Sequence, residues 1–309
     1  MYEKIPTKEM SHEDWLKLRK TGIGGADAGA ICGLNPFSSP MKVFHDKNSE
    51  DIQESVSEAL RQGHDLEQYV AQRFTEATGL KVRCSNYMYR SLKHSFMIAD
   101  VDRLVIGEDA GLECKTASAY NADKWKNGDI PLHYVMQCFH YMAVTGRRTW
   151  YIAAVILGQE FVYRKLAWDD ALIQGLIKAE ENFWHNHIVP GIPPEPDGSQ
   201  TYNEVLEKYF HRSKKESAIP LVGFDEKLER RDEILKQISG LQNEQNKIEQ
   251  EIKLYMEDNE LAASEKYRVS WSSVDTARLD AKRIRQEMPE IYQDYSKVST
   301  SRRFSVKAA

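Results

Sequence analysis

The segment Asp100–Lys115 reads DVDRLVIGEDAGLECK and decides the fold of the surrounding chain. It places an acidic residue, Asp102, eleven positions before Glu113, which opens a Glu-Cys-Lys triplet. Apolar runs lie on either side of a glycine-bounded turn at 107–111. Short apolar runs joined by such a turn predict a β-hairpin. The hairpin would bring the two carboxylates to the same place.

The triplet has the side-chain types that phosphodiester hydrolysis needs. Glu113 and Lys115 are two residues apart, so on a strand they share one face while Cys114 points to the other. Asp102 and Glu113 fit the ligands of a hard cation, and the backbone carbonyl of Cys114 adds a third oxygen. Lys115 fits a group that orients or deprotonates water. The alternative is a solvated Glu113–Lys115 ion pair on an edge strand, which the triplet alone would favour.

The composition is that of an ordinary globular protein. The 309 residues are 41% hydrophobic and 29% charged, with a net charge of −5 and a mean hydropathy of −0.60. The negative charge argues mildly against a broad DNA-coating surface but is compatible with a local basic channel. The four cysteines lack CxxC spacing, which argues against a zinc ribbon and predicts buried free thiols. No apolar run is long enough for a bilayer span, so we expect a cytoplasmic protein without membrane contact.

Hydrophobic periodicity and capping residues predict an α+β layout around a mixed sheet. A helix begins after Ser11, and a glycine-rich bend at 21–27 leads to a short helix that ends at Gly33. A turn before Pro40 opens another helix. Further helices are expected at 54–78, 132–145 and 168–187, with strands at 81–90, 96–106, 110–117, 149–157 and 160–166.

The C-terminal third has a different character. Apolar residues keep a mostly three-to-four spacing from Leu228 to Tyr255, interrupted by Gln245, which predicts a coiled-coil-like helical arm at 224–262. The arm would pair with another helix, or it would lie on the core as a single amphipathic helix. The last part, 263–309, is expected to hold a helix near 275–288 and a short, basic, strand-like tail.

Four more residues are candidates for the functional site because of their local sequence patterns. Glu67 follows a glycine in a GxxxE pattern on a predicted helix. Gln137 and Tyr141 lie at i and i+4, so an amide and a phenol share one helix face. Arg19 precedes the glycine-rich bend. The alternatives are a surface glutamate for Glu67 and ordinary packing for the helical pair.

In their order along the chain, these motifs resemble the YqaJ-like viral recombinases, which are similar to lambda exonuclease and belong to the PD-(D/E)xK nucleases. The resemblance covers residues 10 to about 170. It rests on Trp15 to Arg19, Gly22 to Asp27, Gly63 to Glu67, Asp102 to Val105, Glu113 to Lys115, and Gln137 to Tyr141. It implies a restriction-endonuclease-like nuclease core at 1–215, with a mixed central sheet flanked by helices.

The resemblance also implies roles for the residues that match. Asp102, Glu113 and Lys115 match the metal-binding and catalytic triplet, and Glu67 matches the acidic residue that helps to hold a second metal. Gln137 matches the helix glutamine that supports the site, and Tyr141 completes that motif.

Other positions correspond to contacts with the DNA end. Arg19 matches an arginine that contacts the terminal 5′-phosphate, and the bend with Gly24, Gly25 and Asp27 would lie near that phosphate. Three positions depart from the family pattern. Val101 stands where proline is frequent and Ala26 where serine is frequent, while Asp100 offers a competing carboxylate two residues before Asp102.

The implied activity is a Mg²⁺-dependent exonuclease with one or two metal ions, for which Mn²⁺ could substitute. It would digest the 5′-ended strand of linear duplex DNA and leave 3′ overhangs for recombination by strand annealing. The implied partners are double-stranded DNA ends, a single-strand annealing protein and further copies of the chain in a ring-shaped trimer, in the cytoplasm of a bacterial host of a phage or prophage. An endonuclease of the same superfamily and a non-catalytic DNA-end or protein-bridging module are the alternatives.

Overall fold

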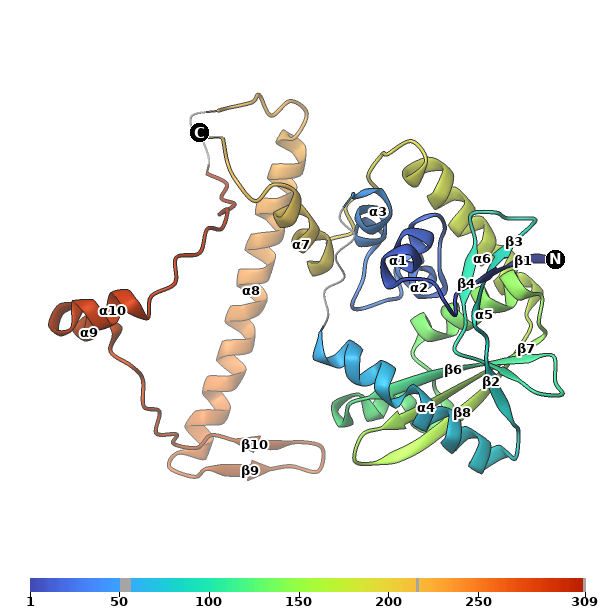
Figure 1. Cartoon of the computed structure of the whole chain (residues 1–309). Coiled ribbons are helices and arrows are strands. Elements are labelled where there is room, and N and C mark those ends of the chain that lie inside the picture. Colours follow the sequence, from blue (N-terminus) through green and yellow to red (C-terminus); the bar gives the residue numbers. More distant parts are fainter. Residues whose placement is uncertain (51–56, 215–216, 308–309) are drawn as a thin grey trace. The chain divides into compact units, whose positions relative to one another are not determined.

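The computed structural model describes residues 1–50, 57–214 and 217–307. The chain divides into two compact units, Met1–His211 and Arg212–Ala309 (Figure 1). The first residues of the helix expected at 54–78, and the expected core boundary at 215, lie outside the described residues. Within the part described, no helix is both long and apolar enough to cross a membrane.

The first unit is built on a mixed sheet with the strand order β2-β5-β6-β7-β8. Strands β6 and β7 run parallel, and the other neighbours are antiparallel. This arrangement, with helices on both faces, is a restriction-endonuclease-like core, and it confirms the predicted fold class. The bounds are Val82–Cys84 (β2), Arg103–Val105 (β5), Ala110–Ala117 (β6), Thr149–Ile156 (β7) and Glu160–Ala167 (β8).

Each face of this sheet packs against its own helix. Helix α4 (Glu58–Thr78) places Phe74 and its neighbours against Leu112 and Cys114 of β6. Helix α5 (Leu132–Thr145) covers the opposite face, where Cys138 and Met142 join the larger core. Alternate residues of β6 therefore face different helices, as the pleat of a strand requires. Gly79 and Gly146 end the two helices in the left-handed conformation, with φ of 74° and 73°.

Two expected strands are each divided between two sheets. The strand predicted at 81–90 breaks at Asn86, whose φ of 57° turns the chain from β2 to β3 (Tyr87–Ser91). The strand predicted at 96–106 breaks after β4 (Ile98–Asp100), and β5 begins at Arg103. Strands β3 and β4 form a second sheet with β1 (Tyr2–Pro6). Asp102 thus lies where the chain passes from one sheet to the other.

The helices before the sheet agree with the predicted capping pattern. Helix α1 spans His12–Lys20, and the Ser11 hydroxyl accepts from its first turn. Helix α2 spans Gly25–Ile31 and packs closely on α5. Helix α3 spans Pro40–Asn48 and is capped by the Ser39 hydroxyl. These short helices set the glycine-rich bend against the helix that holds Gln137 and Tyr141.

Three further helical elements complete the first unit. Helix α6 (Asp170–Phe183) continues into a π-helical turn, η2 (Trp184–Ile188), which agrees with the predicted helix apart from its first residues. The 3₁₀ segment η1 (Ala119–Gly128) and helix α7 (Gln200–Tyr209) were not predicted. Tyr209 of α7 packs edge-on against the His45 ring, with centroids 4.8 Å apart.

The second unit contains one long helix, α8 (Asp225–Met256). A short hairpin of β9 (Leu261–Ala263) and β10 (Arg268–Ser270) follows, then α9 (Ala281–Glu287) and α10 (Pro289–Asp294). Apolar side chains of α8 are exposed, among them Leu235 and Leu241. The predicted strand-like tail is wrong, because residues 301–307 form no strand. The coiled-coil role of α8 stays a prediction.

The cysteines are all free thiols. Cys114 and Cys138 are buried, as predicted, whereas Cys84 is exposed and Cys32 is partly exposed. The prediction of four buried thiols is therefore half right. Cys84 ends the short strand β2, where the chain leaves the sheet.

Candidate active site

The predicted hairpin brings Asp102 next to the Glu-Cys-Lys triplet. Strands β5 and β6 are antiparallel, with Arg103 opposite Leu112, so Asp102 lies beside Glu113. The Cys114 backbone N–H donates to Oδ2 of Asp102 at 2.7 Å. This bond fixes the first carboxylate against the second strand.

Glu113 lies at the centre of the candidate site and is only 2% exposed. Its Oε1 accepts from Nζ of Lys115 at 2.6 Å and from Nε2 of Gln137 at 2.6 Å. Its Oε2 is buried and has no hydrogen-bond partner among the described residues. Because β6 lies inside the sheet and Glu113 is buried, the alternative of a solvated ion pair on an edge strand is wrong.

Gln137 and Tyr141 act together from α5. The Gln137 amide donates to the Tyr141 hydroxyl at 2.9 Å as well as to Glu113. The predicted sharing of one helix face is therefore confirmed. Burial raises the pKa of Tyr141 well above its ordinary value, so the phenol stays protonated.

The pKa values of both carboxyl groups in this cluster are raised, chiefly by burial. Burial, and next the charge of Glu113, raises the pKa of Asp102 well above its ordinary range. Burial also raises the pKa of Glu113. Although burial opposes it, the charges of Glu113 and Asp102 raise the pKa of Lys115, which is therefore protonated at neutral pH. One lysine faces the buried carboxylate of Glu113 and the partly buried carboxylate of Asp102, so a further cation would stabilise the site.

The donor atoms fit a hard cation. Carboxylate oxygens are the ligands that Mg²⁺ prefers, and a buried oxygen without a partner, such as Oε2 of Glu113, calls for one. Within the described ranges, however, no group of three or more His, Cys, Asp or Glu side chains is arranged to hold a metal ion. The fit therefore rests on Asp102 and Glu113.

Glu67 does not join these carboxylates. Its Oε1 forms an ion pair with Nη1 of Arg103, a buried residue of β5. The same Arg103 nitrogen donates to the Asp102 carbonyl at 2.7 Å, and its other terminal nitrogen donates to Gln68 at 3.2 Å. The expectation that Glu67 completes a carboxylate cluster for a second metal is therefore not met in this structure, because Arg103 binds it instead. Sequence reasoning missed Arg103, although it directly follows Asp102.

A second feature lies beside this cluster, which we call the end pocket. It is a cavity of about 150 Å³ lined by Trp15, Arg19, Gly24, Gly25, Ala26, Met88, Ile98, Asp100 and Tyr141. The Arg19 guanidinium lies 4.9 Å from the centre of the Trp15 ring. The Trp15 indole N–H donates to Oδ2 of Asp100 at 2.8 Å. Asp100 thus belongs to the end pocket, whereas Asp102 is bonded to the triplet strand.

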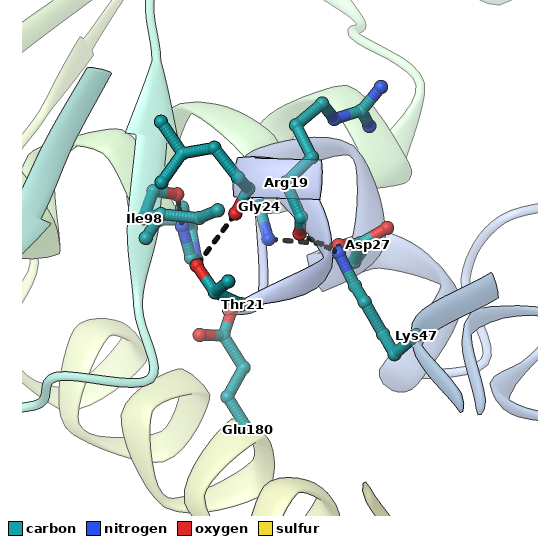
Figure 2. A network of polar contacts seen from close by, with 9 residues as sticks. Arg19, Thr21, Gly24, Asp27, Lys47, Ile98 and Glu180 are labelled. Atoms are coloured by element: carbon teal, nitrogen blue, oxygen red, sulfur yellow. Dashed lines mark hydrogen bonds and ion pairs between the residues drawn. The ribbon is translucent and has the colours of Figure 1, made fainter. Parts of the chain in front are cut away.

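The glycine-rich bend joins the end pocket to the carboxylate cluster. A Cβ added at Gly25 would lie 2.5 Å from the Tyr141 ring and 3.1 Å from Cγ of Gln137. The Asp27 carboxylate accepts from the Gly24 N–H at 2.9 Å and pairs with Lys47 at 2.7 Å (Figure 2). The Asp27 carboxylate therefore fixes the bend, and Asp27 is not among the residues that line the pocket. Lys47 was not found from the sequence, because nothing in its local pattern marks it.

Val101 and Ala26, which depart from the family pattern, lie in different parts of the first unit. Val101 is 5% exposed and packs in the main core, so it serves as an apolar core residue. Ala26 is exposed and lines the end pocket, where it brings no hydroxyl group.

The chain is similar in sequence to known proteins. Residues 14–148 match the YqaJ-like viral recombinase domain family. The chain is 38% identical over 303 residues to an uncharacterized protein YqaJ of Bacillus subtilis (strain 168), across 97% of this chain and 95% of that protein.

Two solved structures share the fold of the first unit. One is LHK-Exo in complex with dAMP, with 19% identity, a TM-score of 0.51, and coverage of 64% of this chain and 98% of that one. The other is the alkaline exonuclease LHK-Exo from Laribacter hongkongensis, with 17% identity, a TM-score of 0.50 and the same coverage. With a full-length relative at 38% identity, the chain belongs to the YqaJ-like viral recombinase family.

Proposed function

We propose that the protein is a Mg²⁺-dependent deoxyribonuclease that digests the 5′-ended strand of linear duplex DNA and leaves a 3′ overhang. The observation that carries the proposal is Glu113, a buried carboxylate that shares one oxygen between Lys115 and Gln137 and keeps the other without a partner. The family and the shared exonuclease fold support the same reading.

Asp102 and Glu113, with the Cys114 carbonyl, would hold the metal, and Glu67 would join a second one only after release from Arg103. When bound, Mg²⁺ would activate water and neutralise charge on the phosphate; Mn²⁺ should do the same. Protonated Lys115 orients the attacking water and meets developing negative charge. Gln137 and Tyr141 keep Glu113 in position. These roles require no movement of the sheet.

The end pocket supports a preference for DNA ends. Its one guanidinium, Arg19, suits a terminal 5′-phosphate, because arginine pairs well with phosphate oxygens. The backbone of Gly24 and Gly25 lines the same cavity. Tyr141 borders both the cavity and the carboxylate cluster. A 5′-phosphate bound in the cavity would therefore place the following phosphodiester bond next to Glu113.

The wider setting follows from the same proposal. Digestion from both 5′ ends produces the single strands that an annealing protein binds, so such a protein is the proposed partner. A ring-shaped homotrimer would keep the duplex threaded, and a phage or prophage gene product would act in the bacterial cytoplasm. Mass measurement in solution tests the trimer, and co-purification with an annealing protein tests the partnership.

The test uses linear duplexes that carry a label on either the 5′ or the 3′ end of one strand, incubated with Mg²⁺. The proposal predicts early release of the 5′ label as mononucleotide, while the 3′ label stays in shortening strands. A covalently closed circle of the same sequence should remain intact. Cleavage of the circle would favour an endonuclease, and intact substrates throughout would favour a non-catalytic end-binding module.

A further inference from the structure

Lys47 is a buried cation beneath the end pocket. Its side chain is 5% exposed at the end of α3, and its ammonium donates to the Arg19 carbonyl at 2.9 Å and pairs with Oδ2 of Asp27 at 2.7 Å. A lysine is rarely buried to this degree without such partners. One ammonium therefore joins the end of α1, the glycine-rich bend and α3 (Figure 2).

The contact with the Arg19 carbonyl holds the backbone of Arg19 in place. Figure 2 shows the carbonyl turned toward Lys47 and the guanidinium extending away from it. At its other end the guanidinium lies over the Trp15 ring, and Asp100 holds that ring through the indole N–H. Arg19 is thus fixed both at its backbone and at its charged tip. A side chain held in this way loses little entropy when it binds an anion.

Lys47 also settles the charge of Asp27. Burial opposes ionisation of Asp27, but the charges of Lys47 and Arg19 lower its pKa below the ordinary value, so it is a carboxylate. Without Lys47, the Arg19 guanidinium would be left as a cation near this carboxylate, whose side chain is 15% exposed. An uncompensated buried charge is costly, so Arg19 would be drawn toward Asp27. The guanidinium would then be less available to a phosphate group.

We propose that Lys47 is the positioning residue of the end pocket: by neutralising Asp27 and holding the Arg19 backbone, it keeps the Arg19 guanidinium available to a terminal phosphate monoester. Lys47 thereby sets the preference for 5′-phosphorylated over 5′-hydroxyl ends. This inference rests on the proposed function. It differs from the family resemblance, which pointed to Arg19 and Asp27 but gave Lys47 no part.

The experiment compares kcat/KM for two linear duplexes that differ only in a 5′-phosphate or a 5′-hydroxyl group. Lys47→Met should lower the phosphate-to-hydroxyl ratio by about tenfold, the scale of one charge-assisted hydrogen bond, mainly through KM for the phosphorylated duplex. Lys47→Arg should keep most of the ratio, because it preserves the cation. Lys20→Met is the matched control, because Lys20 also ties α1 to the end of α3, through the Ser49 carbonyl at 2.6 Å.

A double variant, Lys47→Met with Asp27→Asn, removes both charges and leaves no unpaired buried carboxylate. It should recover part of the lost phosphate-to-hydroxyl ratio of kcat/KM, which a purely structural role of Lys47 would not explain. The double variant also serves as the test if Lys47→Met alone does not fold. An unchanged ratio in folded Lys47→Met, or an equal loss in Lys20→Met, would overturn the inference. Failure of the wild type to digest either duplex would instead overturn the proposed function.

Discussion

The catalytic cluster and the end pocket lie side by side but differ in their charge balance. In the cluster, the buried carboxylate of Glu113 and the partly buried carboxylate of Asp102 face one lysine, Lys115. The end pocket is lined by Arg19 and Asp100, and next to it Lys47 pairs with Asp27. This region therefore has two carboxylates and two cations. The first arrangement is incomplete without an added cation, whereas the second is already balanced.

This difference separates two tasks. A cluster with excess negative charge is suited to recruiting a metal ion and to chemistry on a phosphodiester. A balanced pocket with one oriented guanidinium is suited to selecting an end group. Changes in the cluster should therefore affect the rate of hydrolysis, while changes in the pocket should affect which ends are chosen.

The largest expected effect comes from the cluster. Glu113→Gln keeps the shape of the side chain but removes its charge and hence its ion pair with Lys115, so kcat for digestion should fall by about 10²-fold or more. Single-turnover digestion of a short linear duplex measures this. Glu160→Gln, an exposed glutamate at the start of β8, is the control and should match the wild type. Equal rates for Glu113→Gln and the wild type would remove Glu113 from the mechanism.

The next effect tests the connection between the two regions. Gly25→Ala places a methyl group 2.5 Å from the Tyr141 ring, so the bend or α5 must shift. We expect a loss of about 1–3 kcal/mol in the free energy of unfolding, together with slower digestion of all ends, because overpacking displaces both regions. Urea denaturation measures the first. Gly175→Ala, on α6 with open space at its Cβ, should show neither effect.

A smaller effect concerns pH and the contact between α2 and α5. Burial lowers the pKa of His133 to about 4, and the Cα and Cβ atoms of His133 lie against Gly29 of α2. In the unfolded state His133 binds a proton near pH 6.5, whereas in the folded state it binds one only near pH 4. The free energy of unfolding therefore falls as the pH drops from about 6.5 to about 4. His133→Gln should flatten that part of the pH profile of unfolding. Identical slopes in His133→Gln and the wild type would refute the assignment.

The smallest effect on hydrolysis is expected from the second unit. Leu235→Glu with Leu241→Glu places charges on the exposed apolar side of α8. If α8 serves assembly or partner binding, the variant should digest short duplexes at the wild-type rate but differ in its mass in solution. A matching loss of short-duplex digestion would mean that α8 is part of the catalytic machinery.

The sequence allowed local features to be predicted, because their signals lie within a few residues. The hairpin from Asp102 to Glu113 follows from apolar runs around a glycine-bounded turn, and the Gln137–Tyr141 pair follows from helical spacing. The mixed sheet was predicted from the order of the strands. The breaks at Asn86 and after Asp100 were missed, since no pattern marks a change of sheet.

Contacts between distant segments could not be predicted in the same way. Arg103 reaches Glu67 across 36 residues, and Lys47 reaches the Arg19 carbonyl across 28. Nothing in hydrophobic periodicity shows which carboxylate a buried cation will choose. The ion pair of Glu67 with Arg103 was not predicted for this reason, and the metal-binding role of Glu67 stays a prediction.

The most direct measurement is the rate of digestion of a 5′-phosphorylated linear duplex as Mg²⁺ is added to metal-free protein. The charge excess at Asp102 and Glu113 predicts no digestion in the presence of a chelator and a saturable rise in rate with Mg²⁺. Full digestion without a divalent cation, or none at any Mg²⁺ concentration, would contradict a metal-assisted nuclease.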